Sequence, residues 1–337
     1  MFQRKIVEII AARMREDDNP LIQVVAGPRQ TGKSTAIVQA LEKVDKPAHS
    51  ASADDVIAPD VEWLRTEWQQ ARNLQRDSDR PAILVLDEVQ KVRGWPNVVK
   101  GLWDADQREG RPLKVVLSGS SSLLLRKGFE DSLKGRFEVL CSTHWDLAEC
   151  RGAFGFTLDD FLFFGGFPGA ARLVVDERRW RVYMRDSIIE PTISNDVLEQ
   201  EDVRKPVLLR ALFDLGARFS GQKLFYNKML GQLQDAGNTT TLAHYLTLID
   251  KAGVLCGLKK YHPKAIERRK SSPRLMVYDT ALMTAVSGRS RELLLGNSEP
   301  RGHLVKNAVG ARLLALGPDL GFDVQWWREG NERGPAL

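Results

Sequence analysis

The chain has 337 residues, of which 43% are hydrophobic, so it can bury a real core and has room for about two or three domains. Its three cysteines, Cys141, Cys150 and Cys256, form neither a metal-ligand spacing nor an even disulfide set, which favours a reducing compartment. The formal net charge of +5 favours a polyanionic partner, but the excess is small. The distribution of the basic residues therefore matters more than their total.

The first predicted element is an amphipathic surface helix at the N-terminus. Ile6, Ile9, Ile10 and Met14 share one helical face, with charged residues between them. This pattern differs from that of a signal peptide, and no later apolar run is long enough to span a bilayer. We therefore expect a cytoplasmic protein with no membrane partner.

A phosphate-binding loop is predicted between a short strand at Leu21–Ala26 and a helical pattern at Ala36–Leu41. The sequence GPRQTGKS at 27–34 matches G-x-x-x-x-G-K-[ST], whose backbone N–H groups wrap a phosphate chain at a helix N-terminus. The lysine reaches the outer phosphates, and the serine hydroxyl binds Mg²⁺. The predicted ATP contacts are Gly27, Pro28, Arg29, Gln30, Thr31, Gly32, Lys33, Ser34 and Thr35.

Two carboxylates end the next apolar strand, Ala82–Glu88. The carboxyl ends of parallel strands gather at the sheet edge that holds the phosphate loop. We expect Asp87 to hold Mg²⁺ together with Ser34, and Glu88 to orient and polarise the attacking water.

Two further catalytic residues are predicted after this pair. A third strand begins at Leu113, and Ser118 near its end either hydrogen-bonds the attacking water or phosphate or belongs to an ordinary Ser/Gly turn. Arg136 directly precedes another apolar strand. Arginine suits the charge that develops on a transferring phosphoryl group and is often donated by a neighbouring subunit, although Arg136 alone reads as a surface residue.

Several short motifs together resemble one family of proteins. GPRQTGKST, VLDEVQKVRGW, LSGSSS, SLKGR and FGGFP occur in the order found in bacterial and archaeal AAA+ ATPases with a C-terminal domain of unknown function. The resemblance implies that Asp87 binds Mg²⁺, that Glu88 activates water, that Ser118 is a sensor and that Arg136 acts in a neighbour's site. Together with Lys33 of the phosphate loop, Glu88, Ser118 and Arg136 are the expected catalytic residues. The resemblance also implies a homo-oligomer, with a ring of six as the expected form. A second sensor arginine is left open between Arg172 and Arg185.

The expected fold is α/β, with a P-loop NTPase (AAA+) parallel sheet, a helical lid, a winged helix and an incomplete α/β C-terminal domain. The predicted boundaries are 1–150 for the ATPase core, 151–205 for the lid or linker, 206–280 for the winged helix and 281–337 for the last domain.

The winged helix is predicted from a helix, a turn around Gly237, a second helix, a strand and a basic excursion. Thr239 or Thr240 caps the second helix, while Leu242, Leu246 and Ile249 face inward and Gly253 ends it. The expected DNA contacts are Thr241, His244, Tyr245, Lys264, Arg268, Arg269 and Lys270. Winged helices also bind proteins, and a charged hairpin is often only a solvated loop.

The last segment departs from the family pattern. Relatives continue into a restriction-endonuclease-like fold, but Lys306 stands where its early glutamate is expected, and the sequence ends near the next metal-binding position. Nuclease chemistry needs clustered carboxylates, so we expect a truncated, inactive domain in which Trp326 and Trp327 are core residues.

Two functions are compatible with these patterns. The favoured one is an ATP- and Mg²⁺-dependent protein that binds duplex or branched DNA and couples ATP turnover to remodelling or translocation in replication, repair or recombination. The alternative is a nucleotide-dependent signalling or scaffold switch that acts through protein contacts.

Overall fold

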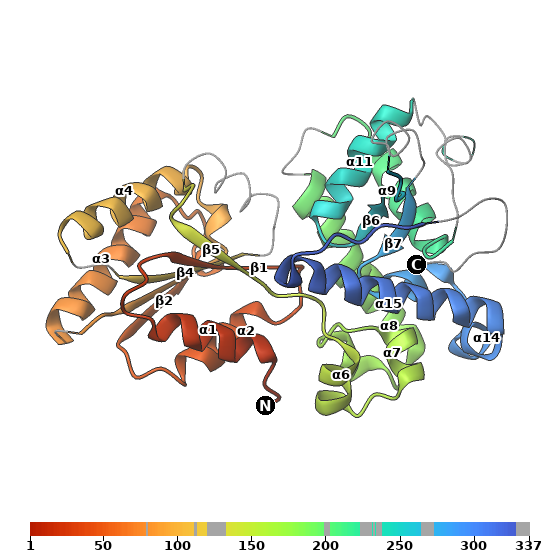
Figure 1. The fold of residues 1–337 in the computed structure, drawn as a ribbon, viewed down its shortest axis with the longest axis horizontal. Coiled ribbons are helices and arrows are strands. Elements are labelled where there is room, and N and C mark those ends of the chain that lie inside the picture. The colour runs from red at the N-terminus through yellow and green to blue at the C-terminus, as the bar shows by residue number, and fades with distance from the viewer. Residues whose placement is uncertain are drawn as a thin grey trace. The chain divides into compact units, whose positions relative to one another are not determined.

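The computed structural model describes residues 1–78, 80–110, 113–119, 133–198, 203–222, 231, 233, 238–263 and 273–327. The chain forms two compact units, Met1–Ser142 and Thr143–Leu337. The units are drawn in Figure 1, and each is described by itself. The predicted end of the ATPase core at residue 150 lies eight residues beyond the end of the first unit, and the boundaries of the four predicted domains stay a prediction.

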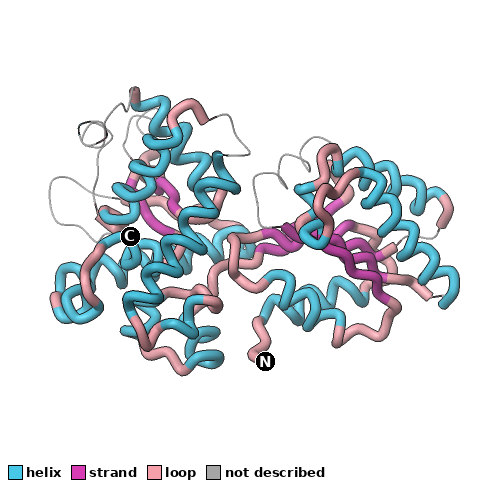
Figure 2. Tube along the Cα trace, turned by 180° about the vertical axis from the view of Figure 1, so that it is seen from behind, coloured by secondary structure: helices cyan, strands magenta, loops and turns pink. Residues whose placement is uncertain are grey.

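The first unit is built on a five-stranded sheet with the strand order β2-β3-β4-β1-β5. All neighbouring strands run parallel, and Figure 2 shows them as one magenta group. The sheet confirms the predicted α/β class. Its strands are β1 (Ile22–Ala26), β2 (Ala48–Ser52), β3 (Ile83–Asp87), β4 (Lys114–Gly119) and β5 (Phe137–Cys141).

Helices cover both faces of this sheet (Figure 1). On β3, Ile83 and Val85 belong to the core under α1 and α2, while Leu84 and Leu86 belong to the core under α3 and α4. Successive side chains of a strand point to opposite faces, so a strand buried on both faces reads as a continuous apolar run. The helices are α1 (Lys5–Arg15), α2 (Lys33–Leu41), α3 (Val61–Ser78) and α4 (Trp95–Arg108).

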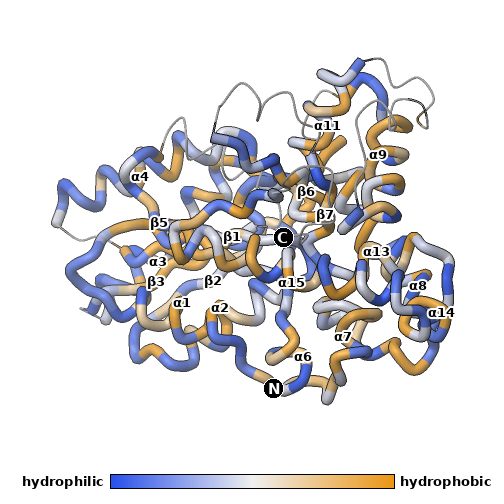
Figure 3. The backbone as a smooth tube through the Cα atoms, turned by 45° about the vertical axis from the view of Figure 1, so that its right-hand side comes forward, coloured by the Kyte–Doolittle hydropathy of each residue, from blue (hydrophilic) through white to orange (hydrophobic). Residues whose placement is uncertain are grey.

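Helix α1 is amphipathic, as predicted, but one of the four apolar residues predicted to share a face lies outside the buried face. Ile6, Ile10 and Met14 are buried, whereas Ile9 is 47% exposed. At 3.6 residues per turn, Ile9 lies outside the arc that also contains the buried Val7 and Ala11. Figure 3 shows hydrophobic and hydrophilic residues alternating along α1 and α2.

The second unit is mainly helical. Two of its early helices begin with capping boxes, at Asp146 with Glu149 and at Thr157 with Asp160, which satisfy N–H groups that a helix leaves unpaired. Short segments of π-helix follow α8, at Met184–Ile189 and Thr192–Leu198. The helices are α6 (Leu147–Phe154), α7 (Leu158–Phe164), α8 (Glu177–Tyr183), α9 (Pro206–Arg218), α11 (Thr239–Lys251), α13 (Thr280–Ser287), α14 (Arg291–Gly296) and α15 (Ser298–Leu320).

Helices α9 and α11 pack on an antiparallel strand pair, β6 (Leu255–Leu258) and β7 (Arg274–Val277). Helix α11 and strands β6 and β7 correspond to the second helix and the two strands of the predicted winged helix, and the winged helix itself stays a prediction. The prediction of the cap was wrong: the side chain of Asn238 accepts a hydrogen bond from the Thr241 N–H, so α11 begins one residue earlier. Most of the short helix predicted before Gly237 lies outside the described residues.

In the described part of 281–337, the expected small α/β domain has no sheet of its own. Helix α15 packs on β7, α7, α13 and α14. Trp326 forms a parallel bridge with Lys260, and its ring lies 5.7 Å from the Lys260 ammonium and 5.6 Å from the Arg274 guanidinium. Trp326 is 9% exposed and Trp327 is 39% exposed, so only the first is a core residue.

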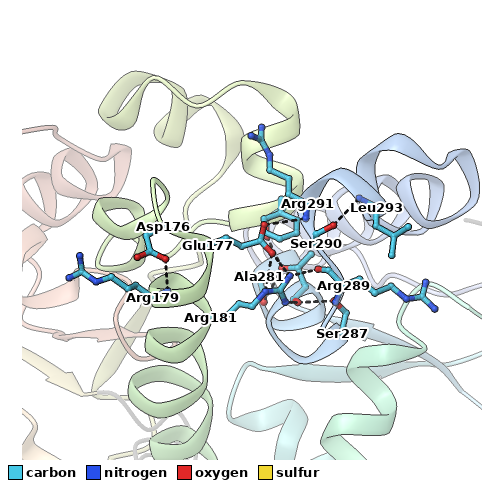
Figure 4. A network of polar contacts seen from close by, with 12 residues as sticks. Asp176, Glu177, Arg179, Arg181, Ala281, Ser287, Arg289, Ser290, Arg291 and Leu293 are labelled. Carbon is cyan, nitrogen blue, oxygen red and sulfur yellow. Dashed lines mark hydrogen bonds and ion pairs between the residues drawn. The ribbon is translucent and has the colours of Figure 1, made fainter.

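A polar network joins α8 to the loop between α13 and α14 (Figure 4). The guanidinium of Arg181 donates to Glu177 at 2.7 Å and to the Thr284 carbonyl at 2.6 Å. Arg291 donates its backbone N–H to Glu177 and its side chain to Asp160 at 2.6 Å. Arg291 joins α14 to carboxylates of α7 and α8, and Arg181 joins α8 to α13, so the network fixes how these helices meet.

The FGGFP motif marks a close backbone approach in the second unit. A Cβ on Gly165 would lie 1.8 Å from the Asp279 carboxyl, and one on Gly166 would lie 2.2 Å from the Trp145 carbonyl. Asp279 accepts 2.8 Å hydrogen bonds from the N–H groups of Gly166 and Ala281. Glycine is therefore required at both positions by packing, and Asp279 connects the end of α7 to the start of α13.

Asp279 is expected to make folding stability depend on pH. Burial raises the pKa of Asp279 to about 7, although the two backbone N–H groups oppose the rise. An unfolded Asp has a pKa of about 3.9, so stabilisation by the neutral carboxyl is complete below about pH 4 and is lost as pH rises through about 7. The thermal midpoint of wild type minus that of Asp279→Asn should therefore fall between about pH 4 and pH 7. A difference that is constant across this range would contradict the prediction.

Candidate functional site

The predicted phosphate loop connects β1 to α2 along a tightly bent path. Gly32 has a φ of 82° and Gln30 a φ of 60°, both in the left-handed region. Gly27 is required for another reason, because a Cβ there would lie 2.0 Å from the Ser142 carbonyl oxygen. A Cβ added to Gly32 would meet no atom within 4 Å, so space is open on that side of the loop.

Lys33 is the first residue of α2 and is buried within the loop. Its ammonium donates to the carbonyl oxygens of Gly27 at 3.1 Å and Pro28 at 2.8 Å. Thr31 is also buried, and its hydroxyl donates to the Pro28 carbonyl at 3.0 Å. A bound phosphate would compete with these carbonyls for the lysine, while helix α2 directs its N-terminus toward the same loop.

The acidic residues predicted to act with the loop lie beside it. The Ser34 hydroxyl donates to Asp87 at 2.6 Å, and the Ser118 hydroxyl donates to the other oxygen of Asp87 at 2.5 Å. These contacts bring α2, β3 and β4 together at one edge of the sheet, as the strand order requires. Ser118 is completely buried, so in this structure it orients Asp87.

Glu88 adopts a left-handed backbone conformation directly after β3, with a φ of 51° and a ψ of 35°. Non-glycine residues rarely adopt this conformation, which turns the chain sharply away from the strand. Its carboxylate accepts a 2.5 Å hydrogen bond from the Gln90 amide, and its N–H donates to Asp87 at 3.0 Å. Gln90 was not identified from the sequence, because its role depends on this turn.

The donor set fits Mg²⁺. A serine hydroxyl and a carboxylate that already meet at 2.6 Å are oxygen ligands of the type that Mg²⁺ prefers. The serine ends a loop that has open space at Gly32 and a buried lysine at position 33, and the carboxylate contacts that serine. Among the described residues, no group of three or more His, Cys, Asp or Glu side chains is arranged to hold a metal.

Arg136 lies at the opposite edge of the sheet from the loop. Its carbonyl accepts a 2.9 Å hydrogen bond from the N–H of Ile22, where β1 begins, whereas the loop follows the end of β1. Its guanidinium donates to Asp104 at 2.8 and 3.2 Å and lies 5.6 Å from the Trp103 ring. The hydrogen bonds from Arg136 lower the pKa of Asp104.

The predicted DNA contacts on α11 differ in their accessibility. His244 is exposed and Thr241 is half-buried, and the Thr241 hydroxyl donates to Asn238 at 3.1 Å. The prediction for Tyr245 was wrong: it is 3% exposed, and its hydroxyl accepts a 3.0 Å hydrogen bond from the Lys205 N–H. Its aromatic body follows the apolar face of the helix. Lys264, Arg268, Arg269 and Lys270 lie outside the described residues.

None of the described helices combines the length and the apolar character needed to cross a membrane. Cys141 is exposed, Cys150 and Cys256 are buried, and all three are free thiols. Burial raises the pKa of the Cys256 thiol, so it is protonated at neutral pH.

Two protein families match successive parts of the chain. Residues 19–150 match a family described as "AAA domain", and residues 155–293 match one described as "Domain of unknown function (DUF8612)". An uncharacterized protein of Haemophilus influenzae is 22% identical over 292 residues, covering 81% of this chain and 70% of its own length. An uncharacterized protein of Mycobacterium tuberculosis is 27% identical over 310 residues, covering 91% of this chain and 65% of its own length.

Solved structures show a weaker likeness. The Aeropyrum pernix Orc1 protein in complex with DNA has 14% identity, covers 84% of this chain and 90% of its own, and has a TM-score of 0.36. The Thermotoga maritima RuvB Holliday junction branch migration motor has 15% identity, 80% and 96% coverage and a TM-score of 0.37. TM-scores this low carry no argument about function. The family match and the parallel sheet together identify the segment 19–150 as similar to AAA domains.

Proposed function

We propose that this chain binds ATP with Mg²⁺ and hydrolyses the bond between its β- and γ-phosphates. The observation that carries the proposal is the meeting of Ser34, Asp87 and Ser118 beside the glycine-rich loop. A loop of this kind holds phosphates with backbone N–H groups, and a neighbouring carboxylate and hydroxyl hold the metal. The match of residues 19–150 to AAA domains supports the same assignment.

Each residue then has a separate task. Lys33 exchanges its loop carbonyls for phosphate oxygens, and Ser34 and Asp87 hold the ion. Mg²⁺ held by these residues would neutralise phosphate charge. Glu88 orients the attacking water, which requires its carboxylate to give up or share the hydrogen bond from Gln90.

Lys33→Ala and Glu88→Gln should separate binding from hydrolysis. We expect Lys33→Ala to lose measurable ATP binding, because it removes the ammonium that the loop carbonyls hold at the start of α2. Glu88→Gln should keep the ATP Kd within about threefold but lower kcat by about a hundredfold or more, as loss of a general base does. Lys43→Ala, which removes an ammonium paired with Glu8 after α2, is the matched control. Turnover in Glu88→Gln equal to that of wild type would remove Glu88 from this role.

We further propose that the second unit binds DNA through α11. Thr240, His244, Thr247 and Lys251 are exposed and recur at intervals of four, three and four residues, so they form one stripe on the helix. This stripe has hydrogen-bonding groups and a cation but no carboxylate. Such a surface suits the edges of bases and the phosphates of a groove. The basic segment that includes Lys264 and Arg268 to Lys270 lies between β6 and β7 in the sequence and adds positive charge to this part of the chain.

Duplex or forked DNA should increase the steady-state ATPase rate, and binding should weaken as salt rises because phosphate contacts release counterions. The double variant His244→Ala/Lys251→Ala should bind DNA at least about fivefold more weakly, since it loses one base-facing group and one phosphate contact. Val207→Ala, which alters an exposed residue of α9, serves as the control. An ATPase rate that DNA leaves unchanged would favour the alternative, a nucleotide-dependent switch that acts through protein contacts.

The position of Arg136 supports action between subunits. It lies where β1 begins, and the loop follows five residues later, so about 16 Å of strand separates it from its own phosphate site. An arginine at that edge reaches a phosphate only in a neighbouring molecule. We propose that assembly of a homo-oligomer, with a hexameric ring as the expected form, breaks the ion pair with Asp104 and places Arg136 in the next site.

Arg136→Ala should lose most hydrolysis while ATP affinity stays within about threefold, as expected of a residue that stabilises only transition-state charge. Mixed with Lys33→Ala, it should regain activity. In a mixed assembly, an intact loop from the arginine variant can receive an intact arginine from the lysine variant. Absence of any recovery across all mixing ratios would argue against the trans geometry.

A further inference from the structure

Arg4 is a buried charged residue that the sequence did not connect with the nucleotide site. It precedes α1, is 6% exposed, and belongs to neither the phosphate loop nor the acidic strand. One nitrogen of its guanidinium, Nη1, donates to the Thr31 carbonyl and to the Ser142 hydroxyl, each at 3.2 Å. The contact partners lie at separate points around the loop.

The contact with Thr31 fixes the orientation of one peptide group in the loop. In a trans peptide the N–H points opposite to the C=O, so a Thr31 carbonyl turned toward Arg4 directs the Gly32 N–H away from it. A Cβ added to Gly32 would meet no atom within 4 Å, so space is open beside this residue. Because Gln30 and Gly32 both have positive φ, this peptide lies in the most sharply bent part of the loop.

The contact with Ser142 fixes the beginning of the loop. The backbone N–H of Ser142 donates to the Ala26 carbonyl at 2.7 Å, at the end of β1. Its carbonyl oxygen lies so close to Gly27 that a side chain is excluded there. Arg4 therefore connects the strand end that confines Gly27 with the bend at Thr31.

We propose that Arg4 is a positioning residue for the phosphate-binding loop, and that it holds the Gly32 peptide in the orientation that receives phosphate. The inference rests on the proposed ATP site and adds a residue outside every segment that defines it. The buried guanidinium also places positive charge near the proposed phosphate site, and this charge also favours binding of an anion there. Arg4 acts on nucleotide affinity through Thr31 and takes no part in the reaction.

The experiment compares Arg4→Met, Arg4→Lys and Ser142→Ala with wild type in the full chain. Arg4→Met keeps much of the apolar stem but removes every donor. It should raise the Kd for a fluorescent ATP analogue, and the KM for ATP, by about tenfold, the equivalent of one charged hydrogen bond, while kcat changes by less than about threefold. Arg4→Lys should recover part of the affinity, because an ammonium retains the charge and a donor. Ser142→Ala should raise the Kd by about threefold.

Arg13→Met is the matched control. Arg13 also connects α1 to β5, through Glu138 at 3.0 Å, but Glu138 pairs with Gln23, far from the strand end at Ser142. Its thermal midpoint should fall while its ATP Kd stays within about twofold of wild type, because it loses packing and an ion pair only.

The outcomes separate this inference from the proposed ATPase. If wild type binds ATP and Arg4→Met binds equally well, the positioning role is overturned and the ATPase stands. A parallel loss of kcat with unchanged KM would also overturn it, since that pattern reports fewer folded molecules. Should Arg4→Met fail to fold, Ser142→Ala decides: a weaker Kd supports the role, and an unchanged Kd overturns it. A wild-type chain that binds no ATP overturns both proposals.

Discussion

The carboxyl group of Asp87 is the point on which the first unit depends. It accepts one hydroxyl from the start of α2 and another from β4, while belonging itself to the end of β3. A partly buried carboxylate that loses such donors pays a large desolvation penalty, so this arrangement fixes the helix and both strands in one register. One of these oxygens contacts Ser34 at the end of the loop, so the carboxylate that orders the sheet edge is also the predicted metal ligand.

The groups that are predicted to act on the nucleotide are already paired with other groups of the chain. Lys33 is engaged with loop carbonyls, Glu88 with Gln90 and Arg136 with Asp104. Each group predicted to act on the nucleotide thus has a partner within its own chain. Interactions of this strength are exchanged when a more strongly charged partner arrives. Under the proposed function, the nucleotide and a neighbouring molecule would supply such partners.

Local sequence patterns selected residues that the structure brings together, Ser34, Asp87 and Ser118, but not the residues that support them. The strands around Val24 and Val85 are apolar on both faces, and the glycine and lysine positions of the loop follow from the phosphate chemistry. Strand β2 was missed because its sequence, AHSAS, contains no large apolar residue and lies at a sheet edge. Arg4 was missed because its partners are 27 and 138 residues away.

Errors in the second unit have the same origin. Tyr245 was predicted to contact DNA from α11, but its hydroxyl reaches the Lys205 backbone while the ring is buried. Aromatic residues with a polar tip satisfy both requirements inside a protein. Helical spacing alone does not distinguish this arrangement from a solvent-facing one, because the deciding partner comes from another segment.

The glycine pair at positions 165 and 166 changes how the most distinctive motif of the chain should be used. Its glycines are imposed by the Asp279 carboxyl and the Trp145 carbonyl, which leave no volume for a methyl group. A homologue that retains this signature has therefore preserved a packing solution, whether or not it still turns over nucleotide. Surveys of such sequences should sort catalytic from degenerate members by the lysine and carboxylates of the first unit, and use the glycine pair only to recognise shared architecture.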